Sequence, residues 1–221
     1  MLTASISKNG ALLFLFAIAT AGILAATYTN TKDTIMAAER KATQAALHEI
    51  VPIDRIDNDL VEDTLEIPKA ALETLGLSDE DNQKHTVAVA KKNGRIIAVI
   101  VPATAPDGYS GDIKMLVGVN RDGSITGVRV LAHKETPGLG DKVDLKRSDW
   151  ILSFNQKSLS NPPPAQWKVN KDGGEFDQFT GATITPRAVV KQVYKALKFV
   201  QDHRLLLFGE ERADNLEISK G

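Results

Sequence analysis

Residues 86–101, Thr-Val-Ala-Val-Ala-Lys-Lys-Asn-Gly-Arg-Ile-Ile-Ala-Val-Ile-Val, contain two apolar segments on either side of Asn93-Gly94. Asn-Gly is the dipeptide that a two-residue β-hairpin turn favours, because both turn positions need a positive φ. The stretch therefore predicts two antiparallel strands, at 86–90 and 95–101. A second hairpin is predicted further along the chain, with strands at 112–120 and 124–131 flanking Arg121-Asp122-Gly123.

The residues around these hairpins predict the rest of the fold. Alternating apolar residues such as Met115, Val117 and Val119 are typical of an antiparallel sheet with one buried face. Helices are predicted at 33–50, 68–75, 148–158 and 186–207, a loop at 57–66 and a short strand at 166–169. Antiparallel hairpins bracketed by helices predict the α+β class.

The N-terminal residues 11–29 carry no charged side chain. A helix of this length crosses a hydrocarbon core of about 30 Å at about 1.5 Å per residue. A cleaved signal peptide is the alternative, but its apolar core is usually only about 7–15 residues long. We therefore expect a retained transmembrane helix at 11–29, a domain at 30–207 and a polar tail at 208–221. The positive charges flanking the run do not settle its orientation.

Composition excludes several classes of function. The net charge is −1, so we expect no nucleic-acid partner, which would require a basic face. The chain has no cysteine, which excludes disulfides, thiol nucleophiles and cysteine-bound iron–sulfur clusters. The histidines do not have metal-site spacing, and His133 is expected to be a hydrogen-bonded loop residue. A chain of this kind that carries electrons needs an organic cofactor.

The segment Asp177-Gln178-Phe179-Thr180-Gly181-Ala182-Thr183 places two hydroxyl side chains around a Gly-Ala pair. Directly after it, Thr185 as N-cap and Pro186 as the first helical residue predict a helix start. The N-terminus of a helix favours a negative group, and small residues leave room for a bulky nucleotide. The pattern indicates a phosphate site, although a plain turn before a helix uses the same residue types.

This segment resembles the Asp-x-x-Ser/Thr-Gly-Ala-Ser/Thr motif of proteins that carry FMN as a phosphoester on a threonine. Residues 108–113 and 128–140 resemble the same family. Together they are similar to the G subunit of the Rnf (or Rsx) ion-translocating electron-transport complex, over most of residues 10–207. The C subunit of the sodium-pumping NADH:quinone reductase is a more distant match. In the family the last Thr of the motif, here Thr183, is the acceptor, and Thr180 stands where Ser is also common.

The resemblance implies an electron-transfer subunit of a redox-driven ion-translocating oxidoreductase, with FMN bound covalently to Thr183 and no catalytic residues of its own. It implies the other membrane subunits of that complex as partners and a flavin transferase for maturation. It also implies the inner membrane, with 1–10 cytoplasmic and 30–207 periplasmic. One alternative is an anchored module that holds a phosphorylated ligand non-covalently, without redox chemistry. Another is a stand-alone flavin reductase, which needs a catalytic constellation that the sequence lacks.

The remaining site residues are predicted around Thr183. Asp177 and Thr180 are expected to orient Thr183 or to contact the transferase, with plain capping as the alternative. The loop 135–140 is expected to lie along the flavin ring with exposed glycine N–H groups, with a purely structural turn as the alternative. Tyr109 is a candidate for stacking on the ring, with an ordinary half-buried aromatic as the alternative. The predicted cofactor-binding residues are Tyr109, Ser110, Glu135, Thr136, Pro137, Gly138, Leu139, Gly140, Asp177, Thr180, Gly181, Ala182 and Thr183.

Overall fold

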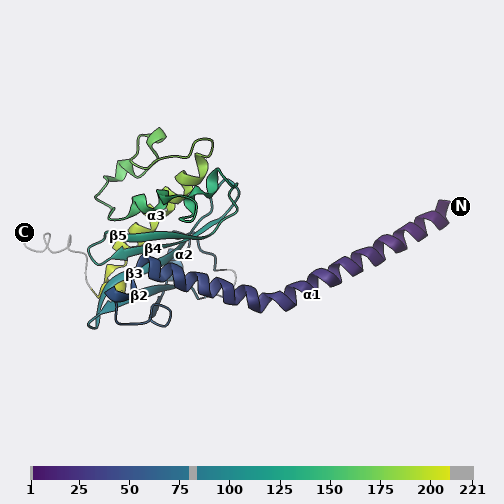
Figure 1. Cartoon of the computed structure of the whole chain (residues 1–221), viewed down its shortest axis with the longest axis horizontal. Helices are drawn as coiled ribbons and strands as arrows, with labels where there is room; N and C mark the ends of the chain where they lie inside the picture. The colour runs from purple at the N-terminus through teal and green to yellow at the C-terminus, as the bar shows by residue number, and fades with distance from the viewer. Residues whose placement is uncertain (1, 80–83, 210–221) are drawn as a thin grey trace, which may run out of the picture. The chain divides into compact units, whose positions relative to one another are not determined.

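The computed structural model describes residues 2–79 and 84–209, so most of the predicted polar tail at 208–221 lies outside the described residues. The chain divides into two compact units, one ending at Thr43 and one beginning at Gln44. The first unit is helical and belongs to α1 (Leu2–Ile50) (Figure 1). By length and composition alone, Asn9–Ile50 is a candidate membrane span.

Helix α1 is longer than the sequence predicts, because the predicted span at 11–29 and the predicted helix at 33–50 form one element. No glycine or proline separates the two segments. The hydroxyls of Thr29 and Thr31 donate to the carbonyls of Ala25 and Thr27, four residues earlier, at 2.9 and 2.8 Å. These threonines satisfy their polar groups inside the helix and therefore do not interrupt it.

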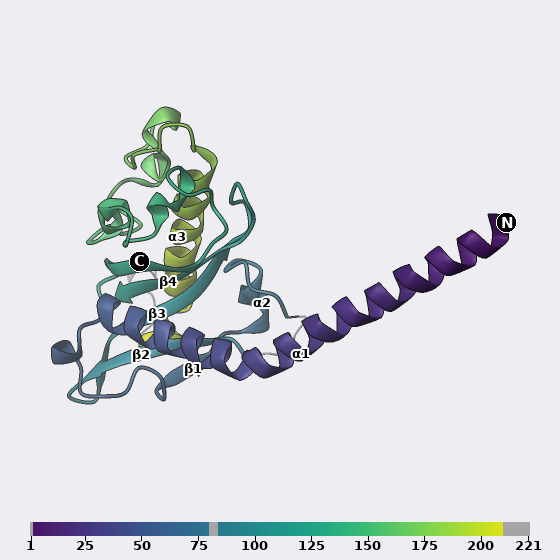
Figure 2. The ribbon, with the colours of Figure 1, turned by 45° about the vertical axis from the view of Figure 1, so that its right-hand side comes forward.

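The second unit is built on a five-stranded antiparallel sheet in the order β1-β2-β3-β4-β5, with β2 to β5 labelled in Figure 1 and β1 to β4 in Figure 2. The strands are β1 (Thr64–Glu66), β2 (Thr86–Lys92), β3 (Arg95–Ala105), β4 (Ile113–Asn120) and β5 (Ile125–Ala132). Asn93 and Gly94 have φ of 52° and 71°, which confirms the predicted tight turn. The predicted α+β class is confirmed, although β1 occupies part of the predicted loop at 57–66.

Both faces of the sheet are covered, so the expectation of a sheet with one buried face is wrong. One face packs against α3 (Ile184–Asp202). The apolar stripe of that helix is fully buried; it consists of Val189, Val193, Leu197 and Val200. The other face packs against the last turns of α1 through Ala46, Leu47 and Ile50. The central strands are therefore apolar on both sides. Because α3 is buried against one of these faces, its N-terminus has a fixed position relative to the sheet.

The segment between β5 and α3 contains little regular structure. The predicted helix at 148–158 is the shorter 3₁₀ helix η3 (Asp149–Phe154), capped by the Ser148 hydroxyl, which accepts from the Trp150 N–H at 3.2 Å. The predicted strand at 166–169 is absent from the described residues, where η4 (Pro164–Gln166) and a single bridge from Val169 are found instead. Aromatic packing holds this segment together, through Trp150, Phe154, Trp167, Phe176 and Phe179.

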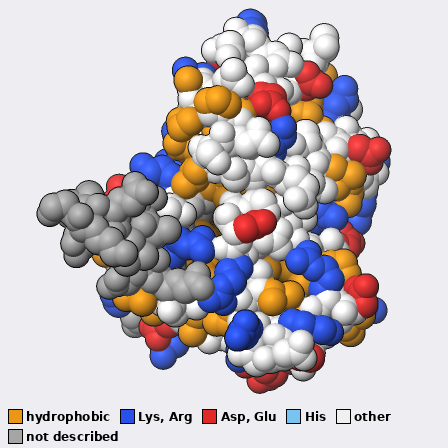
Figure 3. Space-filling model, turned by 90° about the vertical axis from the view of Figure 1, so that its left-hand side faces the viewer, with side chains coloured by type: hydrophobic (Ala, Val, Ile, Leu, Met, Phe, Trp, Pro, Cys, Tyr) orange, Lys and Arg blue, Asp and Glu red, His pale blue; other side chains and the backbone are white. Residues whose placement is uncertain are grey.

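The remaining elements are short. They are η1 (Ile53–Arg55), α2 (Lys69–Leu72), η2 (Gly140–Val143), η5 (Asn170–Asp172) and α4 (Arg204–Phe208). Helix α2 lies within the helix predicted at 68–75. On the face drawn in Figure 3, basic side chains gather in the lower half, with acidic and hydrophobic side chains between them.

Candidate functional site

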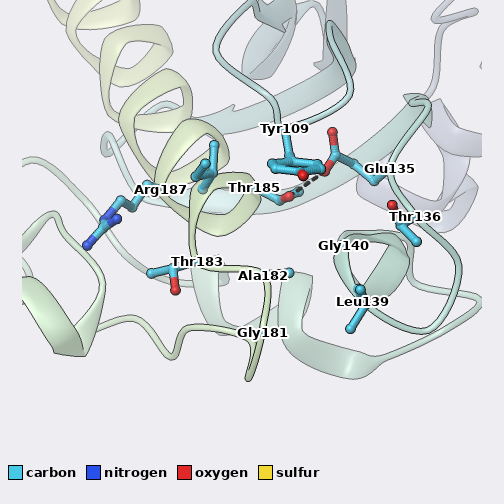
Figure 4. Close-up of a pocket in the computed structure, with 11 residues that line it drawn as sticks. Tyr109, Glu135, Thr136, Leu139, Gly140, Gly181, Ala182, Thr183, Thr185 and Arg187 are labelled. Carbon is cyan, nitrogen blue, oxygen red and sulfur yellow. Dashed lines mark hydrogen bonds between the residues drawn. The ribbon is translucent and has the colours of Figure 1, made fainter.

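Three segments that are far apart in the sequence enclose a pocket of about 430 Å³ (Figure 4). They are the connection between β3 and β4, the segment that follows β5, and the turn that leads into α3. The lining residues are Tyr109, Glu135, Thr136, Leu139, Gly140, Gly181, Ala182, Thr183, Ile184, Thr185 and Arg187. The fold thus brings together residues from all three of the segments in which the site was predicted.

The agreement is not complete at the level of single residues. Five predicted residues do not line this pocket: Ser110, Pro137, Gly138, Asp177 and Thr180. Three residues line it that the sequence did not assign to the site: Ile184, Thr185 and Arg187. No group of three or more potential metal ligands exists among the described residues.

Glu135 joins the three segments. Its carboxylate is buried, with 4 % of the residue exposed. Oε1 accepts the backbone N–H of Ser110 at 2.9 Å, and Oε2 accepts the hydroxyl of Thr185. Both oxygens of this carboxylate therefore bond to protein donors, and Glu135 acts as the link between the three walls of the pocket.

The tight packing around Glu135 explains one of the glycines in the loop. A Cβ on Gly140 would lie only 2.7 Å from Oε2 of Glu135 and 2.9 Å from Oγ1 of Thr185. A glycine is needed there to let the loop approach the buried carboxylate. His133 is a hydrogen-bonded loop residue, as predicted. Its Nδ1 accepts the backbone N–H of Glu135 at 3.1 Å.

The loop 136–140 does not present its amides as the sequence suggested. The N–H groups of Leu139 and Gly140 both donate to the carbonyl of Thr136 at 3.1 Å. The N–H of Gly138 donates to Oδ1 of Asp141 at 2.8 Å. The expectation of exposed glycine amides is therefore wrong, since the tight turn pairs these donors internally. The side chain of Leu139 in this loop lines the pocket and is 43 % exposed.

The start of α3 also differs from the prediction. The helix begins at Ile184, and Thr183, not Thr185, occupies the N-cap position, with φ −78° and ψ −25°. Thr185 lies inside the first turn because its hydroxyl bonds to Glu135 instead of capping the helix. Pro186 is tolerated there, since backbone N–H groups in a first helical turn have no partner within the helix.

Thr183 is placed where a hydroxyl remains available. Its side chain makes no capping hydrogen bond, and the residue is half-buried in the pocket wall. The preceding turn is closed by Gly181, which has φ +82°, and by a 3.1 Å bond from the Ala182 N–H to the carbonyl of Phe179. Phe179 is buried against Trp150, so the turn is tied to the aromatic cluster.

Asp177 stabilises the loop at some distance from the pocket. Its Oδ1 accepts from Nδ2 of Asn170 at 2.6 Å, and its carbonyl accepts from Nε1 of Trp150 at 2.8 Å. Thr180 is exposed and lies outside the pocket lining.

Arg187 adds a positive charge one helical turn after Thr183. Its guanidinium donates from Nε and one terminal nitrogen to both carboxylate oxygens of Asp172, at 2.5 and 2.6 Å. The Arg187 hydrogen bonds, followed by its charge and those of Lys171 and Lys168, hold the pKa of Asp172 below its usual value. The sequence offered no signal for this pair, because Asp172 and Arg187 lie 15 residues apart in different elements, η5 and α3.

Two family models match separate parts of the chain. Residues 1–50 match the RnfG N-terminal region, and residues 108–198 match the FMN-binding domain family. The G subunit of the ion-translocating oxidoreductase complex of Vibrio atlanticus (strain LGP32) is 46% identical over 93% of this chain and 95% of its own length. The chain belongs to this family of G subunits. The proteins of the same name from Shewanella oneidensis and Pseudomonas aeruginosa (strain PAO1) are 45% and 46% identical, covering 92% and 95% of this chain and 93% and 95% of their own lengths.

Membership in this family confirms the resemblance seen in the sequence and makes this chain a subunit of an enzyme complex. The range matched by the FMN-binding domain contains every residue that lines the pocket. The range matched by the RnfG N-terminal region ends with α1, at Ile50. In this member of the G-subunit family, the candidate membrane span and the pocket therefore lie in separately matched parts of the chain.

Proposed function

We propose that this chain is the electron-transfer subunit of an ion-translocating oxidoreductase complex and carries FMN as a phosphoester on Thr183. The observation that carries the proposal is the position of Thr183. Thr183 makes no side-chain cap bond, occupies the N-cap position of α3 and lines the pocket together with Gly181 and Ala182. Family membership and the match to the FMN-binding domain identify the ligand class.

The surroundings of Thr183 suit a phosphate. The N-terminal end of a helix carries a partial positive charge that favours an anion. Arg187 lies one turn further on and lines the same pocket, with its guanidinium paired to Asp172. In the attachment step, the Thr183 Oγ bonds to the phosphorus of the FMN half of FAD, the bridging P–O bond breaks, AMP leaves, and the hydroxyl proton passes to solvent. This step involves no oxidation or reduction.

The pocket fits the organic part of the cofactor. Its volume of about 430 Å³ lies within the range of about 300–1,000 Å³ typical of ligand pockets. Leu139 and Tyr109 give it apolar and aromatic walls, and both side chains are exposed and therefore free to contact a ring. When bound, the isoalloxazine ring supplies one- and two-electron transfer, while the residues of the chain position it.

The cellular setting completes the proposal. α1 is the single span in the inner membrane, with residues 1–10 cytoplasmic and the domain at 30–207 periplasmic. A flavin transferase loads the domain, and the other membrane subunits of the complex exchange electrons with it. A covalent link suits this location, because tethering keeps the local flavin concentration at or above the millimolar range where free FMN would be diluted.

The test compares Thr183→Val with Thr180→Val in the full chain, co-expressed with the flavin transferase. Val keeps the shape of Thr but has no hydroxyl. We expect flavin fluorescence on a denaturing gel for the wild type and for Thr180→Val, and none for Thr183→Val. Mass spectrometry of the peptide that contains residues 180–187 locates the adduct.

Two results separate this proposal from its alternatives. An FMN-sized adduct in Thr183→Val would show that the acceptor is elsewhere. Flavin that binds the native wild type but is lost on denaturation would favour a module that holds its phosphorylated ligand non-covalently.

A further inference from the structure

Helix α3 carries a row of positive charges on its outer face. Arg187, Lys191, Lys195 and Lys198 follow one another at intervals of four, four and three residues, which places them on one side of the helix. The chain as a whole has a net charge of −1, so composition alone does not explain this row.

These cations border a groove of about 660 Å³ between α3 and the segment 164–172. The residues that line it are Pro164, Trp167, Lys168, Val169, Asp172, Arg187, Val190, Lys191, Tyr194, Lys195 and Lys198. Trp167 and Tyr194 pack together with ring centroids 5.5 Å apart, and Val169 and Val190 are buried beside them. An apolar, aromatic floor with a charged rim is the anatomy of a protein–protein interface.

The charge of the groove is only partly balanced within the chain. Asp172 pairs with Arg187, and Asp107 pairs with Lys191. In the described part of the chain, Lys168, Lys195 and Lys198 form no ion pair.

The pKa values of Asp107 and Asp172 reflect this excess of positive charge. The pKa of Asp107 is lowered first by its hydrogen bond to Lys191 and further by the charge of Lys195. The lowered pKa of Asp172 likewise includes contributions from the charges of Lys171 and Lys168, beyond its bond to Arg187. The groove therefore presents a positive field to whatever occupies it.

The groove and the flavin pocket are neighbours. Arg187 lines both of them, and it follows Thr183 by one helical turn, which is about 6 Å along the axis. A molecule that occupies the groove is consequently held beside the pocket in which we place the ring.

We propose that this groove is the docking site for an acidic face of the protein that exchanges electrons with the flavin. The inference rests on the proposed function, because the docking has this purpose only if Thr183 carries the flavin. A protein occupant is favoured over a lipid surface because the site is a concave groove with an aromatic floor and opens next to the cofactor pocket. Complementary charge at such a rim steers the encounter and sets its rate more than its affinity.

The test uses the whole complex in its native membranes, with the full-length chain. The double variant Lys195→Glu/Lys198→Glu reverses the charge of the groove. The matched control Lys92→Glu/Arg95→Glu reverses two exposed charges at the β2–β3 hairpin. We expect the groove variant to lower the rate of flavin reduction by the complex about tenfold or more at low salt, with unchanged flavin content on the denaturing gel. The control is expected to stay within about twofold of the wild type, and added salt to slow the wild type.

A second measurement identifies the occupant without using the flavin. Tyr194 is replaced by the photo-cross-linking residue p-benzoylphenylalanine, and the membranes are illuminated. The expected adduct is a peptide rich in Asp and Glu from another protein of the complex. A lipid adduct, the absence of any adduct, or equal rates in the groove and control variants would overturn the docking proposal. Absence of covalent flavin from the wild type would overturn the proposed function and with it the electron-transfer purpose of the docking. An acidic cross-linked peptide would in that case still show that the groove binds a protein.

Discussion

The contact between Thr185 and Glu135 is predicted to hold the start of α3 against the segment that follows β5. The variant Thr185→Val tests this prediction. Thr185 is fully buried, and its hydroxyl donates to Oε2 of Glu135. Valine keeps the branched shape but removes the donor, so the carboxylate stays buried with one bond fewer. A hydrogen bond to a charged group contributes about 1.5–3 kcal/mol to the free energy of unfolding.

The expected loss is large enough to measure. For a domain of about 150–250 residues, 1 kcal/mol corresponds to about 2–4 °C in Tm, so Thr185→Val is expected to lower Tm by about 3–12 °C. Tryptophan fluorescence during thermal or denaturant unfolding of the flavin-free full chain in detergent follows this change. Both tryptophans, Trp150 and Trp167, lie in the unit that contains the pocket and report on it.

Two further variants make the result specific. Thr180→Val removes an exposed hydroxyl from the same loop and should change the free energy of unfolding by less than about 0.5 kcal/mol. Glu135→Gln keeps an oxygen for the Ser110 N–H and an amide that donates to the Thr185 hydroxyl, so it should cost less than Thr185→Val. Equal stabilities of Thr185→Val and Thr180→Val would refute the role given to this contact.

Three other predictions follow from the structure. Gly118→Ala should destabilise the domain by about 1–3 kcal/mol, because its Cβ would lie 2.2 Å from a side chain of α1; unchanged denaturant unfolding would contradict that packing. Arg187→Gln should raise the lowered pKa of Asp172 toward its usual value in a carboxyl NMR titration. In the wild type, the Arg187–Asp172 pair stabilises the fold above the pKa that Asp172 has in the unfolded chain. This stabilisation is lost as the pH falls through the lower pKa that Asp172 has in the folded chain. An unchanged Asp172 titration in Arg187→Gln would exclude Arg187 as the cause of the lowered pKa. Ser5→Cys and Lys146→Cys should label from opposite sides of the membrane with an impermeant reagent, and equal labelling would contradict a single span.

The sequence predicted the parts of the fold that short-range chemistry determines. Asn93-Gly94 specifies its turn through the φ values of two adjacent residues, so the hairpin is visible in a few letters. The stripe on α3 is equally local, because it needs only a period of 3.6 residues. The short strand β1 was missed since its three residues gain regular structure only by pairing with β2.

The errors in the helices have a related cause. At 29–33 nothing in the chain stops a helix, so two predicted elements merge into α1. At 148–158 the apolar spacing suggested an α-helix, but Trp150 and Phe154 pack edge to face at 5.3 Å within a cluster of aromatic rings. Side-chain packing between distant segments decides the backbone there, and periodicity carries no information about it.

The same distinction applies to the site. Contiguous motifs identified the three segments of the pocket, but not the bonds that join them. The contact of Glu135 with Thr185 spans 50 residues, and the partner of Arg187 lies 15 residues earlier. The direction of the amides at 138–140 was also not predictable, because it depends on a turn that closes on Thr136 and Asp141.

The three threonines that follow Phe179 differ in how well they suit the attachment proposed for Thr183. Thr180 is exposed and does not line the pocket, so a group attached there would not be held by the walls. Thr185 lines the pocket but is fully buried, with its hydroxyl donated to Glu135. Thr183 alone of the three combines a place in the pocket wall with partial exposure and a hydroxyl free of capping. Under the proposed attachment, the role of Glu135 is to engage the hydroxyl of Thr185, which leaves Thr183 as the threonine of the pocket wall with an unengaged hydroxyl.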